Sequence, residues 1–165
     1  MNEGLAEMLK YTRWANRRLL EACRDLTERQ LDAQPAGLSG SIRELFVHLV
    51  GGQQTFALRT LGRQHEGELN RKSAWPGFDR LIELVAAADE ELVARSRSLD
   101  GSETVVLAFM GKRYLYPVRF FLAHSVAHSS EHRTEIKVGL GSIGVATPDL
   151  DGWEFAAAQG YGGEV

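Results

Sequence analysis

Residues 117–138 read PVRFFLAHSVAHSSEHRTEIKV and predict one long helix. Pro117 suits the first turn of a helix, and aromatic, aliphatic and histidine side chains recur at intervals of three and four. A helix turns about 100° per residue, so positions four apart lie within about 40° of each other. His124, His128 and His132 therefore share one face. The opposite face holds the residues expected to meet solvent: Arg119, Ser130 and Lys137. The histidines are expected on the buried side.

Three more stretches have helical periodicity, and they predict helices over residues 2–24, 41–61 and 76–96. Ser41-Ile42-Arg43-Glu44 has the form of a capping box, which marks the start of the second of these helices. Four long helices, with no internal repeat and no change of composition, predict an all-α helical bundle that forms one domain over residues 1–165.

Two segments between the predicted helices have different patterns. β-Branched and aromatic residues at Thr104–Phe109 and Arg113–Tyr116 flank Met110-Gly111-Lys112, which favours a short β-hairpin before the last long helix. Residues 63–74 are polar and are expected to form a surface loop, in which His65 is solvated. Residues 153–159 are expected to form one further short helical turn.

Composition narrows the class of protein. The 165 residues carry a formal net charge of −3, with 44% hydrophobic and 25% charged residues, as in ordinary globular proteins. The acidic balance argues against a nucleic-acid-binding protein, and no apolar run reaches the roughly 18–20 residues of a membrane helix. Cys23, the only cysteine, lies on an apolar stripe and is expected in the core. We expect a cytoplasmic protein.

The histidines suggest a metal site. Two imidazoles one helical turn apart can face a single ion, and His48 lies on the core-facing stripe of the helix predicted over residues 41–61. Three imidazoles without a cysteine suit Zn, Ni, Cu or Fe(II), and three protein ligands leave a position for water or substrate. The alternative is that these histidines are hydrogen-bonded packing residues.

Four segments together resemble the DinB/YfiT-like family of metal-binding four-helix bundles. Residues 11–20 (YTRWANRRLL) resemble its first-helix signature, and residues 41–49 (SIRELFVHL) resemble the segment that supplies its first histidine ligand. Residues 124–133 (HSVAHSSEHR) resemble its H-x-x-x-H-x-x-x-H-R motif, and residues 149–153 (DLDGW) its ending. The resemblance implies an up-down four-helix bundle that often forms a homodimer.

Transferred by position, the resemblance assigns His48, His128 and His132 as metal ligands and places His124 beside them without ligation. This chain has Glu131-His132-Arg133-Thr134-Glu135 where the family often has His-His-Arg-Gly-Gln. Glu135 could accept the N–H of a ligating imidazole, act as a base, or face solvent. The role of Glu131 stays open.

The resemblance also implies a function. Characterised relatives bind a divalent metal that activates a low-molecular-weight thiol such as bacillithiol or mycothiol, so the chain is expected to be a zinc- or nickel-dependent S-transferase acting on a small electrophile. The physical basis is that a metal-bound thiol loses its proton near neutral pH. One alternative is a hydrolase in which the metal activates water. Another is a stress-related bundle that binds metal or ligand without turnover.

Overall fold

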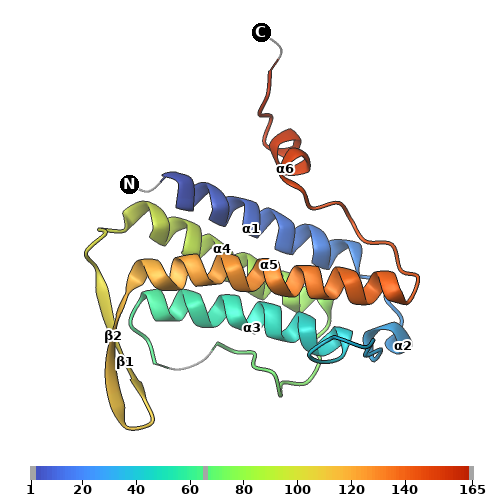
Figure 1. Ribbon diagram of the computed structural model, residues 1–165, viewed down its shortest axis with the longest axis horizontal. Helices are drawn as coiled ribbons and strands as arrows, with labels where there is room; N and C mark the ends of the chain where they lie inside the picture. Colours follow the sequence, from blue (N-terminus) through green and yellow to red (C-terminus); the bar gives the residue numbers. More distant parts are fainter. Residues whose placement is uncertain (1–2, 65–66, 164–165) are drawn as a thin grey trace.

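The computed structural model describes residues 3–64 and 67–163 (Figure 1). Its elements, in chain order, are α1 (Glu3–Ala22), α2 (Glu28–Leu31), α3 (Ile42–Thr60), α4 (Phe78–Ser98), β1 (Thr104–Phe109), β2 (Lys112–Pro117), α5 (Val118–Ser142) and α6 (Gly152–Ala158). The expectation that His65 is solvated concerns a position outside the described residues.

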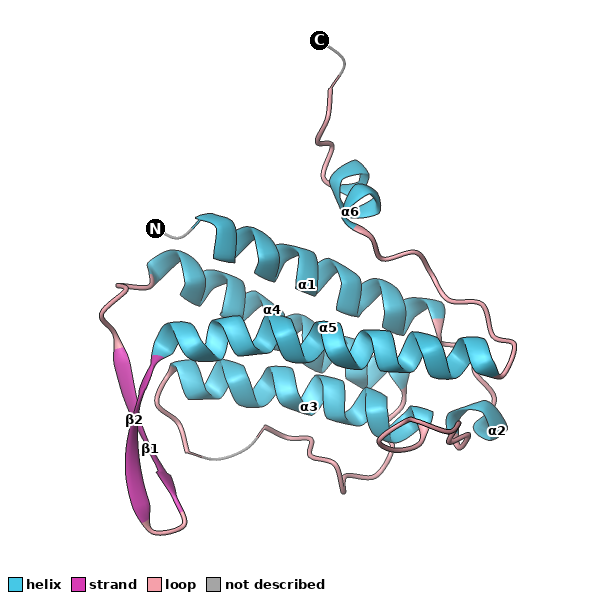
Figure 2. Ribbon diagram, viewed as in Figure 1, coloured by secondary structure: helices cyan, strands magenta, loops and turns pink. Residues whose placement is uncertain are grey.

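Four long helices form the body of the molecule. α1 packs on α4 and α5, and α3 packs on the same two helices, so α1 and α3 lie diagonally opposite each other. Figure 2 shows the four helices side by side, with the β-hairpin projecting at one end and α6 outside the bundle. The predicted all-α bundle with a hairpin before its last long helix is confirmed. No helix in the described part of the chain is long and apolar enough to cross a membrane.

The path of the chain differs from the expected up-down order, because α3 and α4 run parallel. Contacts in the same order along both helices join Phe46 to Phe78, Gln53 to Asp89, and Thr60 to Arg95. A parallel arrangement requires the connection between α3 and α4 to cover the length of α3. Its 17 residues, 61–77, are enough, since an extended chain covers about 3.3 Å per residue. The 19 residues of α3 span only about 28 Å. Figure 1 shows the described part of this connection, residues 67–77, running back beside α3 on the outside of the bundle.

Capping and turn residues in the sequence mark where α3 begins, but they do not mark where α5 ends. Ser41 caps α3, and its side chain accepts from the Glu44 N–H as the capping box predicts. α5 continues past its predicted end near residue 138 to Ser142. Gly139 lies inside the helix rather than at its end, and it is where the side chains of Leu38 and Ile42 approach the backbone closely. A Cβ there would lie 2.5 Å from Leu38 Cδ2 and 2.8 Å from Ile42 Cδ1.

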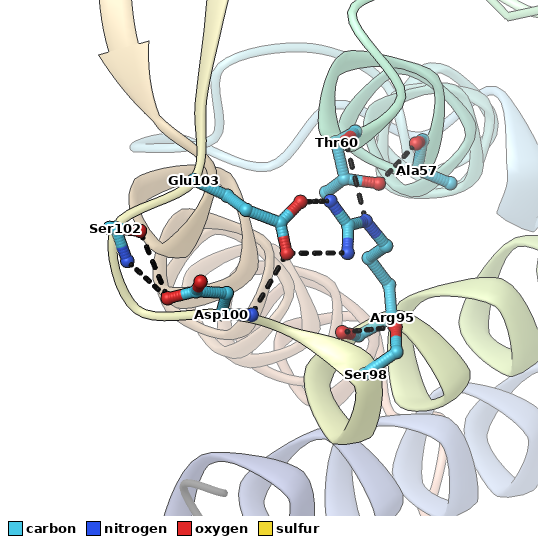
Figure 3. A network of polar contacts seen from close by, with 7 residues as sticks. All are labelled: Ala57, Thr60, Arg95, Ser98, Asp100, Ser102 and Glu103. Carbon is cyan, nitrogen blue, oxygen red and sulfur yellow. Dashed lines mark hydrogen bonds and ion pairs between the residues drawn. The ribbon is translucent and has the colours of Figure 1, made fainter.

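The hairpin has a two-residue turn and is fixed to the bundle at its base. Met110 (φ 49°) and Gly111 (φ 75°) both have positive φ, as tight hairpin turns require. Figure 3 shows Arg95 near the end of α4 binding the carboxylate of Glu103 with two of its nitrogens and reaching the carbonyl oxygen of Thr60. The ends of α3 and α4 and the start of the hairpin are thereby joined.

A buried polar network crosses the centre of the bundle and uses one residue from each long helix. Asn16 of α1 donates to Asp89 of α4 (3.0 Å), and Gln53 of α3 donates to the other oxygen of that carboxylate. Arg133 of α5 donates to the amide oxygen of Asn16 (2.7 Å). All four residues are at most 3% exposed. Burial raises the pKa of Asp89 to about 6, against the opposing effect of these hydrogen bonds.

Candidate metal centre

Antiparallel packing of α3 against α5 brings three of the predicted site residues together. The Nε2 atoms of His48 and His128 are 3.2 Å apart. One ring nitrogen from each of His48, His128 and His132 lies within 4.8 Å of the other two. Two nitrogens bound tetrahedrally at 2.0–2.1 Å to one ion would be about 3.3 Å apart. The spacing of the closest pair therefore fits a shared metal ion, and the three-imidazole donor set suits zinc or nickel.

His128 owes its position to the absence of a side chain at Gly52. A Cβ on Gly52 would lie 2.3 Å from His128 Cε1 and 2.9 Å from Nδ1, where no atom could be accommodated without displacement. The ring of His128 therefore lies directly against the backbone of α3. Its Nδ1 is buried and has no hydrogen-bond partner among the described residues, and its Nε2 faces His48.

Glu135 orients His132. The Oε2 atom of Glu135 lies 2.9 Å from His132 Nδ1, and its Oε1 accepts the backbone N–H of Ser39 at 2.5 Å. Burial alone would raise the pKa of Glu135, but these hydrogen bonds outweigh it and lower the pKa. An ionised carboxylate at this position fixes the proton of His132 on Nδ1, which leaves Nε2 free to ligate. Of the three arrangements considered for Glu135, the structure has the one in which its carboxylate is hydrogen-bonded to an imidazole of the group.

The electrostatics of the site keep two of the rings neutral. Burial, followed by the positive charge of Arg71, lowers the pKa of His48 to about 4. Burial, followed by His132 and His48, lowers the pKa of His128 to about 3. Neutral imidazole is the form that binds metal, so near neutral pH no proton has to leave these two rings first.

The site is open on one side. A cavity of about 600 Å³ is lined by His48 and His128, by Gly52 and Phe56 of α3, and by Arg71 and Lys72 of the α3–α4 connection. Within the described ranges, no fourth metal-binding side chain joins the group of three histidines. Cys23 is in the apolar core as predicted, where burial raises the pKa of its thiol to about 12. The arrangement therefore leaves coordination positions for a small molecule.

Two other candidate residues lie outside the group of three. The expectation that His124 lies on the buried side is wrong: it is exposed near the start of α5, and its ring packs on Phe56 and Phe120 at centroid distances of 4.6 and 5.4 Å. Glu131 is exposed on the same helix. Neither belongs to the set of side chains whose donor atoms converge.

Sequence reasoning missed the wall of the cavity. Arg71 and Lys72 belong to the polar stretch 63–74, which was expected to be only a surface loop. Polar residues give the same pattern whether they face solvent or a site, so nothing in the stretch marked them out. For Gly52, the signal was a glycine on a buried helical stripe, one turn after His48.

The family model of the DinB superfamily matches residues 11–136 of the chain. The chain belongs to the DinB superfamily. A DinB-like protein from Bacillus cereus ATCC 10987 matches with a TM-score of 0.66 at 20% identity, over 90% of this chain and 96% of its own.

A second solved structure is YfiT from Bacillus subtilis, with a TM-score of 0.68 at 16% identity, over 88% of this chain and 91% of its own. It is described as a probable metal-dependent hydrolase with an unusual four-helix bundle topology. The comparison with curated proteins gives no match. At these identities the two structures establish the fold of this DinB-superfamily chain, which is the family expected from its motifs.

Proposed function

We propose that this protein is a metal-dependent S-transferase that uses a low-molecular-weight thiol, such as a bacillithiol- or mycothiol-like compound, against a small electrophile. His48, His128 and His132 would hold the metal, with zinc or nickel the best fit to three imidazoles. When bound, the metal would supply Lewis-acid activation that makes the thiol acidic enough to ionise near neutral pH. In the transfer, sulfur bonds to the electrophile, and the leaving group departs with the electrons of the broken bond.

The observation that carries this proposal is the lack of a free base. Among the described residues, no aspartate, glutamate or cysteine lines the 600 Å³ cavity. Glu131, which precedes His132 in sequence, is exposed, and the carboxylate of Glu135 is already bound to His132 and to the Ser39 N–H. A metal-bound thiol needs no protein base once it has ionised, whereas activation of water is helped by one. This arrangement favours a nucleophile that the substrate brings with it.

Hydrolysis is the second candidate. The open three-histidine site could equally hold a metal-bound water, and the structurally similar YfiT is described as a probable metal-dependent hydrolase. A bundle that binds metal or ligand without turnover would use the same residues. The three functions differ in what they require besides metal: a thiol and an electrophile, a hydrolysable bond, or nothing.

One experiment separates them. Zinc- or nickel-loaded protein is incubated with a small thiol and monochlorobimane or chlorodinitrobenzene, and separately with a panel of esters and amides. Metal-free protein and the His128→Ala variant measure the background. Thiol-dependent turnover above that background supports the S-transferase, and thiol-independent hydrolysis overturns it in favour of the hydrolase. Absence of both reactions in metal-loaded protein, checked by elemental analysis, overturns both enzymatic proposals.

A further inference from the structure

The α3–α4 connection is fixed against α3 directly beside the histidines. A Cβ on Gly51 would lie 2.5 Å from the carbonyl oxygen of Leu69, so the connection lies directly on the helix backbone there. The Leu69 N–H donates to Gln54 Oε1 at 3.2 Å, and the Leu69 side chain is buried. The missing side chain of Gly51 therefore leaves room for the backbone of the connection, just as that of the next residue, Gly52, leaves room for the ring of His128.

A turn held by its own hydrogen bonds follows and presents two cations to the cavity. The backbone N–H of Asn70 donates to Ser73 Oγ (3.0 Å), and that of Lys72 donates to Asn70 Oδ1 (2.9 Å). Arg71 and Lys72 lie within this turn, and both line the same cavity as His48 and His128. Their position in the cavity wall is set by the anchors on both sides of them.

These two cations have no direct ion-pair partner among the described residues, although the positive charge of Arg71 adds to the Ser41 hydrogen bonds that lower the pKa of Glu44. Neither side chain forms a hydrogen bond or ion pair with any residue in the described ranges, whereas Arg43, Arg80 and Arg95 are all paired with carboxylates. Arg71 also borders a second cavity of about 110 Å³ that Glu44 lines. The carboxylate of Glu44 is bound to the N–H and hydroxyl of Ser41, so it is committed to capping α3.

The site therefore keeps an excess of positive charge once metal is bound. The three imidazoles are neutral, so the carboxylate of Glu135 beside His132 offsets only one of the two charges of a divalent ion. One thiolate would neutralise the other, and Arg71 and Lys72 add two more positive charges. In a partly enclosed cavity, such an excess favours ligands with a further negative group.

We propose that Arg71 and Lys72 are specificity-determining residues that bind a carboxylate, or a similar anionic group, on the small molecule whose other end reaches the three histidines. The inference rests on the proposed function, because it concerns the ligand of the same site. It names the chemical class of that ligand: an acidic thiol, with its sulfur and its anionic group separated by a short linker.

The test compares two thiols that differ mainly in charge. Cobalt(II)-loaded protein is titrated with 3-mercaptopropionate and with 2-mercaptoethanol, and binding is followed by the thiolate-to-cobalt absorption band. We expect the anionic thiol to bind about tenfold more tightly, as for one charge-assisted hydrogen bond. In the Arg71→Gln/Lys72→Gln variant the two affinities should become equal. The matched control is Lys112→Gln/Arg113→Gln, which removes an exposed pair of the same charges from the hairpin and should keep the tenfold preference.

Each outcome decides between the two proposals. Equal binding of both thiols by the unmodified protein overturns the anion-binding role and leaves the thiol function standing. If neither thiol produces the band, the thiol function fails, and calorimetry of the zinc-loaded protein with glutarate and glutaramide then decides the anion-binding role. Preference for glutarate that is lost only in the Arg71/Lys72 variant supports that role, and equal binding of the two compounds overturns it.

Discussion

Replacing Gly52 by alanine is the sharpest test of the metal centre, because it perturbs a proposed ligand without removing it. Ordinary van der Waals contact begins near 3.4 Å, and the new Cβ would lie 2.3 Å from His128 Cε1, so the ring must shift by about 1.1 Å. Metal–ligand distances tolerate only about 0.2 Å. The rings of His48, Phe56 and His132 contact the His128 ring, so the space open to it is the cavity, and movement into the cavity changes its position relative to the other two ligands.

The expected result is a loss of metal affinity with little loss of fold. We expect the zinc dissociation constant of Gly52→Ala to rise at least about 100-fold, or about 2.7 kcal/mol. Alanine is favoured over glycine inside a helix by about 1 kcal/mol, which offsets part of the strain in the metal-free protein. Competition with a chromophoric chelator measures the affinity, and thermal melting of the metal-free protein measures the stability.

The matched control makes the same substitution in open space. A Cβ on Gly141, in the last turn of α5, would have no atom within 4 Å, so Gly141→Ala should bind zinc like the unmodified protein. If Gly52→Ala also binds zinc with unchanged affinity, His128 does not ligate from the position described, and our account of the site is wrong.

Three further predictions follow from the same contacts. Glu135→Ala should weaken zinc binding about 10–100-fold by releasing His132, and Glu135→Gln, which keeps an acceptor, should weaken it less; chelator competition measures both. Bound zinc should raise the melting temperature at pH 7.5 and still do so at pH 5.5, because protons reach His48 and His128 only near pH 4 and 3; a gain already absent at pH 6 would contradict this. The raised pKa of Asp89 means that protonation stabilises the fold as pH falls from about 6 towards 3.8, by on the order of 3 kcal/mol, so Asp89→Asn should remove this contribution from the pH dependence of the unfolding free energy.

Much of the fold could be predicted because its signals are local. Periodicity places α3 and α4 within two residues of their observed bounds. The path of the chain could not be predicted this way. An amphipathic stripe specifies which face of a helix is buried, but it is the same for a parallel and an antiparallel neighbour. The direction of α4 depends on where the connection from α3 leads the chain, and the largely polar sequence of that connection does not indicate which helix it follows.

For the candidate site as well, the residues with local sequence signals could be predicted, and those positioned by tertiary contacts could not. Spacing on one helix placed His128 and His132 on a common face. The core-facing stripe of the helix predicted over residues 41–61 added His48, and the family motif then assigned all three as ligands; the structure places all three together. The supporting contacts depend on tertiary structure. Ser39 reaches Glu135 across 96 positions of sequence, and the cation pair reaches the cavity only because Leu69 sits on Gly51. A single sequence contains no direct signal for such long-range contacts.

The buried network explains why two polar residues of the family-like motifs lie in the bundle at all. Asn16 and Arg133 do not belong to the converging histidines; they join Asp89 and Gln53 in the dry interior. Burying such groups costs free energy unless they are paired, and each of these four side chains makes at least one hydrogen bond where the four helices meet, although the amide oxygen of Gln53 has no partner among the described residues. Arg133 directly follows His132, and Gln53 directly follows Gly52. The network thus fixes the height of α5 against α3 one residue away from the ligands, and a slip of one helical turn would separate the histidines by about 5.4 Å.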